Sequence, residues 1–277
     1  MAWWHSQTRL IFPGAATQGK PEAALPPGGD FEIVRLRARD GTEIVGQFGR
    51  AAVPAGHGAA APLTVVFFCG NGSCIAQNDD EFTRFRRLGC NAMMADYEGY
   101  GLSGGRPSEA GCYATAEAVY EHLLGRADVD PTRIVLAGRS LGAAVAIDLA
   151  SRRPVAGLIA ISPFTSMRAM ARRTHPWWPT GMLLRHHFDN LAKIPSVACP
   201  ILLVHGLMTD ALLESTIERM MARPRVSLIH VPQAGHTPTL SDPIHIDLLG
   251  RWCHSPDDWP REMTTSWTLR PERLLFR

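Results

Sequence analysis

A serine between two glycines is the residue whose surroundings in this chain point most clearly to chemistry. The residues from Gly138 to Gly142 read Gly-Arg-Ser-Leu-Gly, after an aliphatic run at 134–136 and before an alanine-rich run at 143–150. This order predicts a buried strand, a tight turn and a helix. In such a turn a serine projects above the sheet, and the glycines allow close packing. We predict that Ser140 is a nucleophile; a plain Gly-Ser turn is the alternative.

A serine hydroxyl is a weak nucleophile at neutral pH, so it needs a general base and an acidic group that orients the base. Both groups should follow the serine in the chain, in loops at the carboxyl ends of later parallel strands. Asp210 lies in the loop after an apolar run at 201–204, and His236 in the loop after a run at 226–231. We predict that Asp210 is the acid and His236 the base. The alternatives are a helix N-cap for Asp210 and an ordinary loop histidine for His236.

The remaining requirement is a pair of backbone amides for the negative charge that develops on a carbonyl under attack. The apolar run at 63–69 ends in a Gly-Asn-Gly-Ser turn at 70–73, and Leu141 begins the helix after the serine. We predict that the amides of Asn71 and Leu141 form this oxyanion hole, because the first amides of a helix lack partners inside the helix. For Asn71 the alternative is a simple turn after a strand.

The elements that position these residues follow from the spacing of apolar side chains. Alternation at 31–39 and a second strand at 43–48, joined by Asp40-Gly41, predict an antiparallel hairpin. Strands and helices then alternate, which predicts a mostly parallel, doubly wound α/β sheet. The expected strands are 63–69, 90–96, 134–136, 155–161, 201–204 and 226–231, and the expected helices are 77–88, 109–124, 143–150, 212–221 and 243–252.

We divide the chain into one principal domain and two flanking segments. Residues 1–30, rich in proline and glycine, form an irregular arm in which only 9–12 is apolar enough to dock. The single domain covers 31–253, with a short cap-like insertion at about 167–198. Residues 254–277 form a C-terminal tail.

Composition limits the classes of partner. The chain has 277 residues, of which 45% are hydrophobic and 19% charged, and its net charge is +2. Its arginines are scattered, so we predict no nucleic-acid partner. No run approaches the about 20 apolar residues that span a bilayer, and the first residues lack the pattern of a signal peptide. The six cysteines show no Cys-x-x-Cys spacing. We therefore expect a cytoplasmic protein with reduced thiols and no integral membrane segment.

Two further motifs bear on cofactors. The glycine-rich stretch 96–109 lacks the Lys-Ser/Thr ending of a phosphate-binding loop, and adjacent side chains of the His-His-Phe-Asp stretch at 186–189 project in different directions. We interpret both as structural and predict neither a metal nor a cofactor. Trp177 and Trp178 belong to the cap-like insertion, where we expect packing rather than substrate contact.

Several stretches together resemble an α/β-hydrolase-fold serine hydrolase of the ABHD13-like, ABHD17-like and Bem46-like branch. They are spread over about residues 8–250 and comprise 70–73, 96–109, 133–142, 162–166, 188–190 and 235–236. By position, Ser140 resembles the family nucleophile, Asp210 the acid and His236 the base. Three residues separate Gly206 from Asp210, where relatives usually have two. Asp189 is therefore a second acidic candidate, although the resemblance places it in a structural segment.

The predicted reaction is hydrolysis of a carboxylic ester or thioester through an acyl-enzyme intermediate. An ester or thioester is expected because its alcohol or thiol leaves more readily than an amine, and because the open site that the short insertion predicts imposes little selection. The expected partner is a small-molecule or acyl substrate. Two alternatives stay open. One is a peptidase or amidase of the same fold, and the other is a non-catalytic binding protein of that fold.

Overall fold

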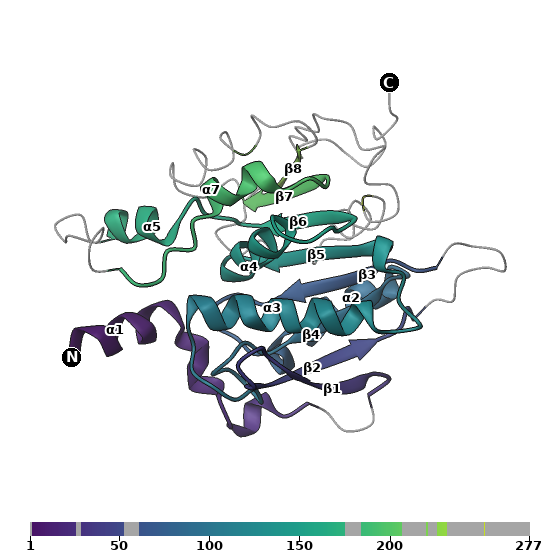
Figure 1. Ribbon diagram of the computed structural model, residues 1–277, viewed down its shortest axis with the longest axis horizontal. Helices are drawn as coiled ribbons and strands as arrows, with labels where there is room; N and C mark the ends of the chain where they lie inside the picture. The colour runs from purple at the N-terminus through teal and green to yellow at the C-terminus, as the bar shows by residue number, and fades with distance from the viewer. Residues whose placement is uncertain are drawn as a thin grey trace.

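A computed structural model describes residues 2–25, 29–52, 61–174, 184–206 and 226–231, together with Met220 and Trp252. These residues form an eight-stranded sheet in the order β1-β2-β4-β3-β5-β6-β7-β8 (Figure 1). The strands are β1 (Glu32–Arg37), β2 (Glu43–Gly49), β3 (Thr64–Phe68), β4 (Asn91–Ala95), β5 (Ile134–Arg139), β6 (Gly157–Ile161), β7 (Ile201–Gly206) and β8 (Val226–Val231).

Strand direction agrees with the sequence prediction. β2 pairs antiparallel with both β1 and β4, and every other neighbouring pair is parallel. The mostly parallel α/β sheet with an antiparallel hairpin at its start is therefore confirmed. In the parallel part, the carboxyl ends of the strands lie along one edge of the sheet, and loops at that edge can meet.

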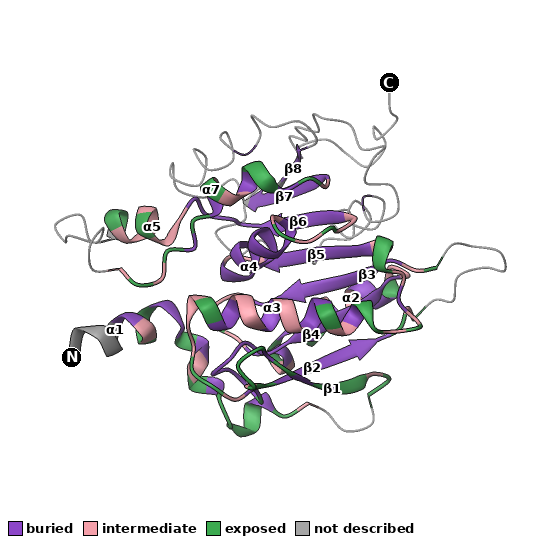
Figure 2. Ribbon diagram, viewed as in Figure 1, coloured by how far each residue is buried: buried purple, intermediate pink, exposed green. Residues whose placement is uncertain are grey.

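Helices cover both faces of the sheet, which explains why every residue of β3, β4 and β6 is buried and most of them are apolar. Successive side chains of β3 alternate between the faces: Val66 packs in a core with helices α3 (Glu109–Leu124) and α4 (Leu141–Ala150), whereas Val65 packs toward α2 (Asp79–Arg87). The central strands and α4 are buried, whereas exposed residues gather on α3 and β1 (Figure 2). None of the described helices combines the length and hydropathy that crossing a membrane requires.

The N-terminal segment differs from the irregular arm that the sequence predicts. It contains helix α1 (Ala2–Ile11) and the 3-10 helices η1 (Pro13–Thr17) and η2 (Pro21–Ala23). The prolines open the 3-10 helices rather than preventing them, because the first residue of a helix needs no N–H donor. Ile11 and Phe12 are buried, and the Phe12 ring centroid lies 5.0 Å from that of His186. The apolar stretch at 9–12 therefore supplies the docking residues, whereas Leu10 is exposed.

The remaining elements lie near their expected positions. The expected helix at 77–88 is a 3-10 helix, η3 (Ile75–Asn78), followed by α2, and η4 (Pro131–Arg133) precedes β5. The insertion contains α5 (Met167–Thr174), α7 (Asn190–Lys193) and η5 (Ile194–Ser196). Trp177, Trp178 and the tail lie outside the described residues, as do the expected helices at 212–221 and 243–252 apart from Met220 and Trp252, which are both buried.

Candidate active site

Ser140 occupies a strained turn between β5 and α4. Its φ of 54° and ψ of −110° are values that a residue with a Cβ rarely adopts, and such strain costs about 1–3 kcal/mol. The surrounding backbone holds it there. The Ser140 amide donates to the Ile161 carbonyl at 2.9 Å, and the Ser140 carbonyl accepts from the amide of Ala143 at 3.1 Å. The serine is thereby fixed at the carboxyl edge of the sheet.

The two flanking glycines are required by close contacts between backbones. A Cβ on Gly138 would lie 2.1 Å from the carbonyl oxygen of Gly142, and one on Gly142 would lie 2.0 Å from the carbonyl oxygen of Phe68. The start of α4 therefore packs directly on the ends of β3 and β5. Leu141 is the first residue of α4, so its N–H has no acceptor within the helix.

The turn after β3 lies beside the serine turn. A Cβ on Gly70 would be 3.6 Å from the carbonyl oxygen of Arg139, the residue before Ser140. The next residue, Asn71, is held by its carbonyl oxygen, which accepts from the Tyr100 hydroxyl at 3.0 Å and from the Gly14 amide at 2.9 Å. The structure thus brings the turn that contains Asn71 next to the turn that contains Ser140.

The N-terminal segment is a part of this site that sequence reasoning missed. The Asn71 side chain donates to the carbonyl of Ile11 at 3.1 Å, and Gly14 contributes the amide that binds the Asn71 carbonyl. These contacts join residues about sixty positions apart in the chain. No local pattern marks such a partner, although the apolar residues at 11 and 12 did indicate that this segment docks.

A buried carboxylate secures the far end of the same turn. The Asp96 carboxylate accepts from the amide of Ile75 at 2.8 Å and from that of Leu102 at 3.0 Å. Burial raises its pKa from the ordinary 3.8 to about 6. Gly101, with a φ of 47°, leaves room for it, since a Cβ there would be 2.0 Å from an Asp96 oxygen. The glycine-rich stretch therefore folds around Asp96.

Two cysteines near the turn do not offer a competing nucleophile. Cys69 and Cys74 are buried on either side of the turn. Burial raises the pKa of both thiols above the ordinary value, and a thiol rather than a thiolate is a poor nucleophile.

Asp210 and His236 lie outside the described residues. The strands that precede them are described, and their register shows where each strand ends. Arg139 pairs with Ile161, Ile161 with Val204, and Gly206 with Val231. β7 and β8 therefore end at the edge where Ser140 lies.

The second acidic candidate, Asp189, is a helix cap. Its Oδ1 accepts from the amide of Ala192 at 3.2 Å at the start of α7, and its side chain is exposed. The neighbouring His186 accepts through Nδ1 from the amide of Glu109 at 3.2 Å, and burial lowers its pKa. Among the described residues, no three His, Cys, Asp or Glu side chains are grouped to hold a metal ion.

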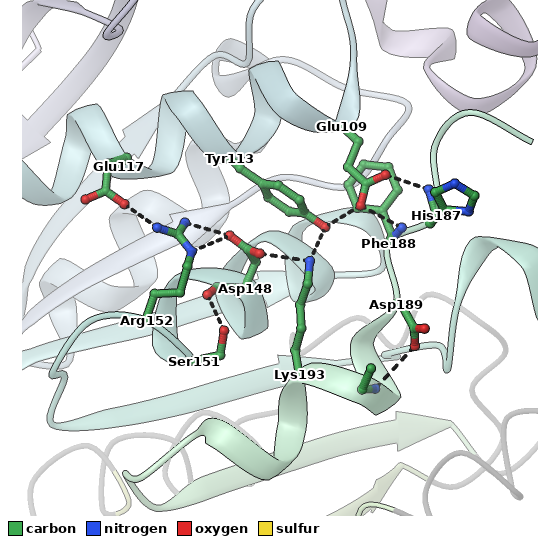
Figure 3. A network of polar contacts seen from close by, with 11 residues as sticks. Glu109, Tyr113, Glu117, Asp148, Ser151, Arg152, His187, Phe188, Asp189 and Lys193 are labelled. Atoms are coloured by element: carbon green, nitrogen blue, oxygen red, sulfur yellow. Dashed lines mark hydrogen bonds and ion pairs between the residues drawn. The ribbon is translucent and has the colours of Figure 1, made fainter.

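Polar contacts fasten the end of the insertion to α3 and α4 (Figure 3). The Glu109 carboxylate accepts from the amide of Phe188 and from the Tyr113 hydroxyl, both at 2.8 Å. Lys193 donates to the same hydroxyl at 2.7 Å and pairs with Asp148 at 2.8 Å. The segment around residues 186–193, which includes a left-handed Phe188 at φ 39°, is thereby anchored beside the site.

The sheet order and the strained serine turn between strand and helix define an α/β hydrolase. The sequence model of a family described as serine aminopeptidase, S33, matches residues 60–223, and the chain belongs to this family. The family match supports hydrolase activity.

Related sequences and solved structures agree with this assignment. An uncharacterized protein of Mycobacterium tuberculosis is 37% identical over 245 residues, covering 86% of this chain and 84% of the relative. The alpha/beta hydrolase domain-containing protein WAV2 of Arabidopsis thaliana is 30% identical over 231 residues, covering 76% of this chain and 73% of the relative. An alpha-beta hydrolase from Vibrio vulnificus has a TM-score of 0.69 at 19% identity, with 92% of each chain covered. A Pyrococcus furiosus esterase has a TM-score of 0.65 at 17% identity, covering 83% of this chain and 94% of its own.

Proposed function

We propose that this protein is a serine hydrolase that cleaves carboxylic esters or thioesters through an acyl-enzyme intermediate. The observation that carries the proposal is the backbone of Ser140, held at φ 54° between a buried strand and a buried helix. Strain of about 1–3 kcal/mol gathers at functional sites, and here it supports a nucleophile because it presents a serine hydroxyl at a helix N-terminus.

In the proposed mechanism, His236 takes the proton from the Ser140 hydroxyl, and the oxygen attacks the substrate carbonyl. The amides of Asn71 and Leu141 stabilise the oxyanion, and loss of one such donor costs roughly 10²–10³-fold in rate. His236 then protonates the leaving alcohol or thiol, and the same imidazole activates the water that releases the acid. Asp210 holds the imidazole in the required tautomer.

A small-molecule or acyl substrate suits this site. The insertion between β6 and β7 is short, and the segment at 186–193 is fastened to α3 and α4 rather than extended as a large lid. The name of the structurally similar Pyrococcus furiosus protein, an esterase, agrees with ester cleavage. A second candidate is aminopeptidase or amidase activity, which the description of the matching family favours.

Turnover of matched substrates tests the proposal. The panel contains p-nitrophenyl esters from acetyl to palmitoyl, the corresponding acyl thioesters, and aminoacyl p-nitroanilides. We expect ester or thioester turnover that falls by roughly 10⁴–10⁶-fold in Ser140→Ala. Ser151→Ala, at a serine that only caps the end of α4, is the matched control and should retain activity. Undiminished turnover in Ser140→Ala contradicts the proposal, and faster cleavage of anilides favours the peptidase candidate.

The acidic residue is tested by a pair of isosteric variants. Asp210→Asn should lower kcat strongly, because an amide cannot hold the correct imidazole tautomer; the corresponding change in trypsin costs roughly 10⁴-fold. Asp189→Asn should leave activity near the wild-type value, since asparagine caps a helix as well as aspartate does. The opposite pattern would assign the acid to Asp189.

A further inference from the structure

The residue before Ser140 makes contacts that its place in a strand does not require. The Arg139 side chain is only 17% exposed and runs toward α2 and the end of η3. Its Nη1 pairs with Glu81 of α2 at 2.8 Å, and its Nη2 donates to Oδ1 of Asn78, the last residue of η3, at 2.7 Å. On the way its Nε passes 4.0 Å from the position of a Cβ on Gly70. Arg139 therefore lies against the turn that contains Asn71.

Asn78 continues this contact to the turn itself. The side-chain oxygen Oδ1 of Asn78 accepts from Arg139. The side-chain nitrogen Nδ2 donates to the hydroxyl oxygen of Ser73 at 2.9 Å and to the backbone carbonyl of Cys74 at 2.8 Å. A guanidinium can only donate, so Arg139 also fixes which way round the amide of Asn78 lies. Arg139, Asn78 and Ser73 thus form a continuous chain of hydrogen bonds, and all three residues are at least half-buried.

This chain of contacts joins the two turns whose separation matters to the proposed reaction. Oxyanion donors act when they lie about 2.7–3.1 Å from the developing charge. A displacement of about 1 Å can cost roughly 10²-fold in rate. The turn at 70–73 contains two glycines and belongs to neither a helix nor a strand. Side-chain contacts therefore set its spacing from Ser140, and those of Arg139 and Asn78 approach it from the side of the serine turn.

We propose that Arg139 is a positioning residue that sets the distance between Ser140 and the turn containing Asn71, acting through Asn78. The inference rests on the proposed function. Arg139 touches no reacting atom in this scheme; it acts by keeping the oxyanion amides where the tetrahedral intermediate needs them. Its loss should therefore lower kcat rather than raise KM, because a misplaced donor weakens transition-state binding more than substrate binding.

The test compares Arg139→Lys with Arg126→Lys. Arg126 is a matched arginine away from the site. Its side chain is 14% exposed and pairs with Asp128 and Glu32. Its Cζ lies 3.9 Å from the centroid of the Phe48 ring. Both variants are measured for kcat, KM, the rate of labelling by a fluorophosphonate and the free energy of unfolding. We expect roughly 10²-fold lower kcat and a slower labelling rate in Arg139→Lys, with KM within about threefold, and unchanged kinetics in Arg126→Lys.

A second variant breaks the chain of contacts at its other end. Asn78→Asp keeps an acceptor for Arg139 but places a carboxylate oxygen against the Cys74 carbonyl, so it should also lower kcat at constant KM. If Arg139→Lys fails to fold, this variant carries the test. If kcat in Arg139→Lys and Asn78→Asp stays at the wild-type value, or falls no more than in Arg126→Lys at the same loss of unfolding free energy, the inference is overturned. Labelling that persists in Ser140→Ala instead overturns the proposed function, so the two failures are distinguishable.

Discussion

Replacement of the buried carboxylate Asp96 by asparagine removes a contribution to stability that depends on pH in a defined direction. Asp96 is 2% exposed, and burial raises its pKa from 3.8 to about 6 while two backbone amides bind it. The folded protein therefore holds a proton that the unfolded chain has released between these pH values. The Asp96 contribution to stability is fully present below about pH 3.8 and is lost as pH rises to about 6.

The size of the effect follows from the shift. About two pKa units at about 1.4 kcal/mol each correspond to about 3 kcal/mol, reached over the window from about pH 4 to about pH 6. An asparagine side chain cannot ionise, so Asp96→Asn lacks this loss. The amide must present its NH₂ to one of the two backbone N–H groups, which adds a cost of about 1–3 kcal/mol at every pH. Relative to wild type, the variant should thus gain about 3 kcal/mol across the window.

Urea unfolding of both proteins at steps from about pH 2 to about pH 8 measures this difference, because shared titrations cancel, and the range includes the pH values below 3.8 that the control requires. Asp130→Asn is the control of opposite sign. Hydrogen bonds from Thr132 lower the pKa of Asp130, so its contribution is present above the ordinary pKa and is lost as pH falls. A difference between wild type and Asp96→Asn that is independent of pH, or that changes in the opposite direction, would refute the reasoning.

Two further substitutions test the packing around the site. Gly142→Ala places a Cβ 2.0 Å from the backbone oxygen of Phe68, which cannot move freely. We expect the free energy of unfolding, measured by thermal unfolding, to fall by at least about 1–3 kcal/mol, and fluorophosphonate labelling to slow. Wild-type values for both would show that the contact is not tight. Glu109→Gln places an amide NH₂ against the backbone amides of His187 and Phe188, which donate to the wild-type carboxylate. We expect the free energy of unfolding in urea to fall by about 1–2 kcal/mol. An unchanged urea midpoint would contradict the anchoring role.

The sheet could be predicted from the sequence because parallel strands covered on both faces must be apolar throughout. Val65 and Val66 pack against opposite cores, and only a continuous run satisfies both. The serine turn could be predicted because a Cβ at 138 or 142 would lie about 2 Å from a backbone oxygen, so only glycine fits at these positions. In both cases the physical requirement restricts the residue types at neighbouring positions, so it can be recognised in a short stretch of sequence.

Other features could not be predicted because their causes lie far away in the chain. The helix at Ala2–Ile11 ends where Ile11 and Phe12 dock, and its partner Asn71 is sixty positions away. The expected helix at 77–88 begins earlier, as the 3-10 helix Ile75–Asn78. Its first amide, that of Ile75, donates to the carboxylate of Asp96, which is 21 positions away in the chain. The contact between Arg139 and Asn78 spans 61 positions. Such partners become identifiable only once the fold has placed them.

Identification of the residue that a fluorophosphonate modifies tests the central claim most directly. The wild-type protein is labelled, digested and analysed by mass spectrometry, in parallel with folded Ser140→Ala. We predict a single phosphonate adduct on the Ser140 hydroxyl of the wild type and none in the variant. An adduct on another residue, or a folded wild-type protein that the reagent does not modify, would contradict the assignment of Ser140 as the nucleophile.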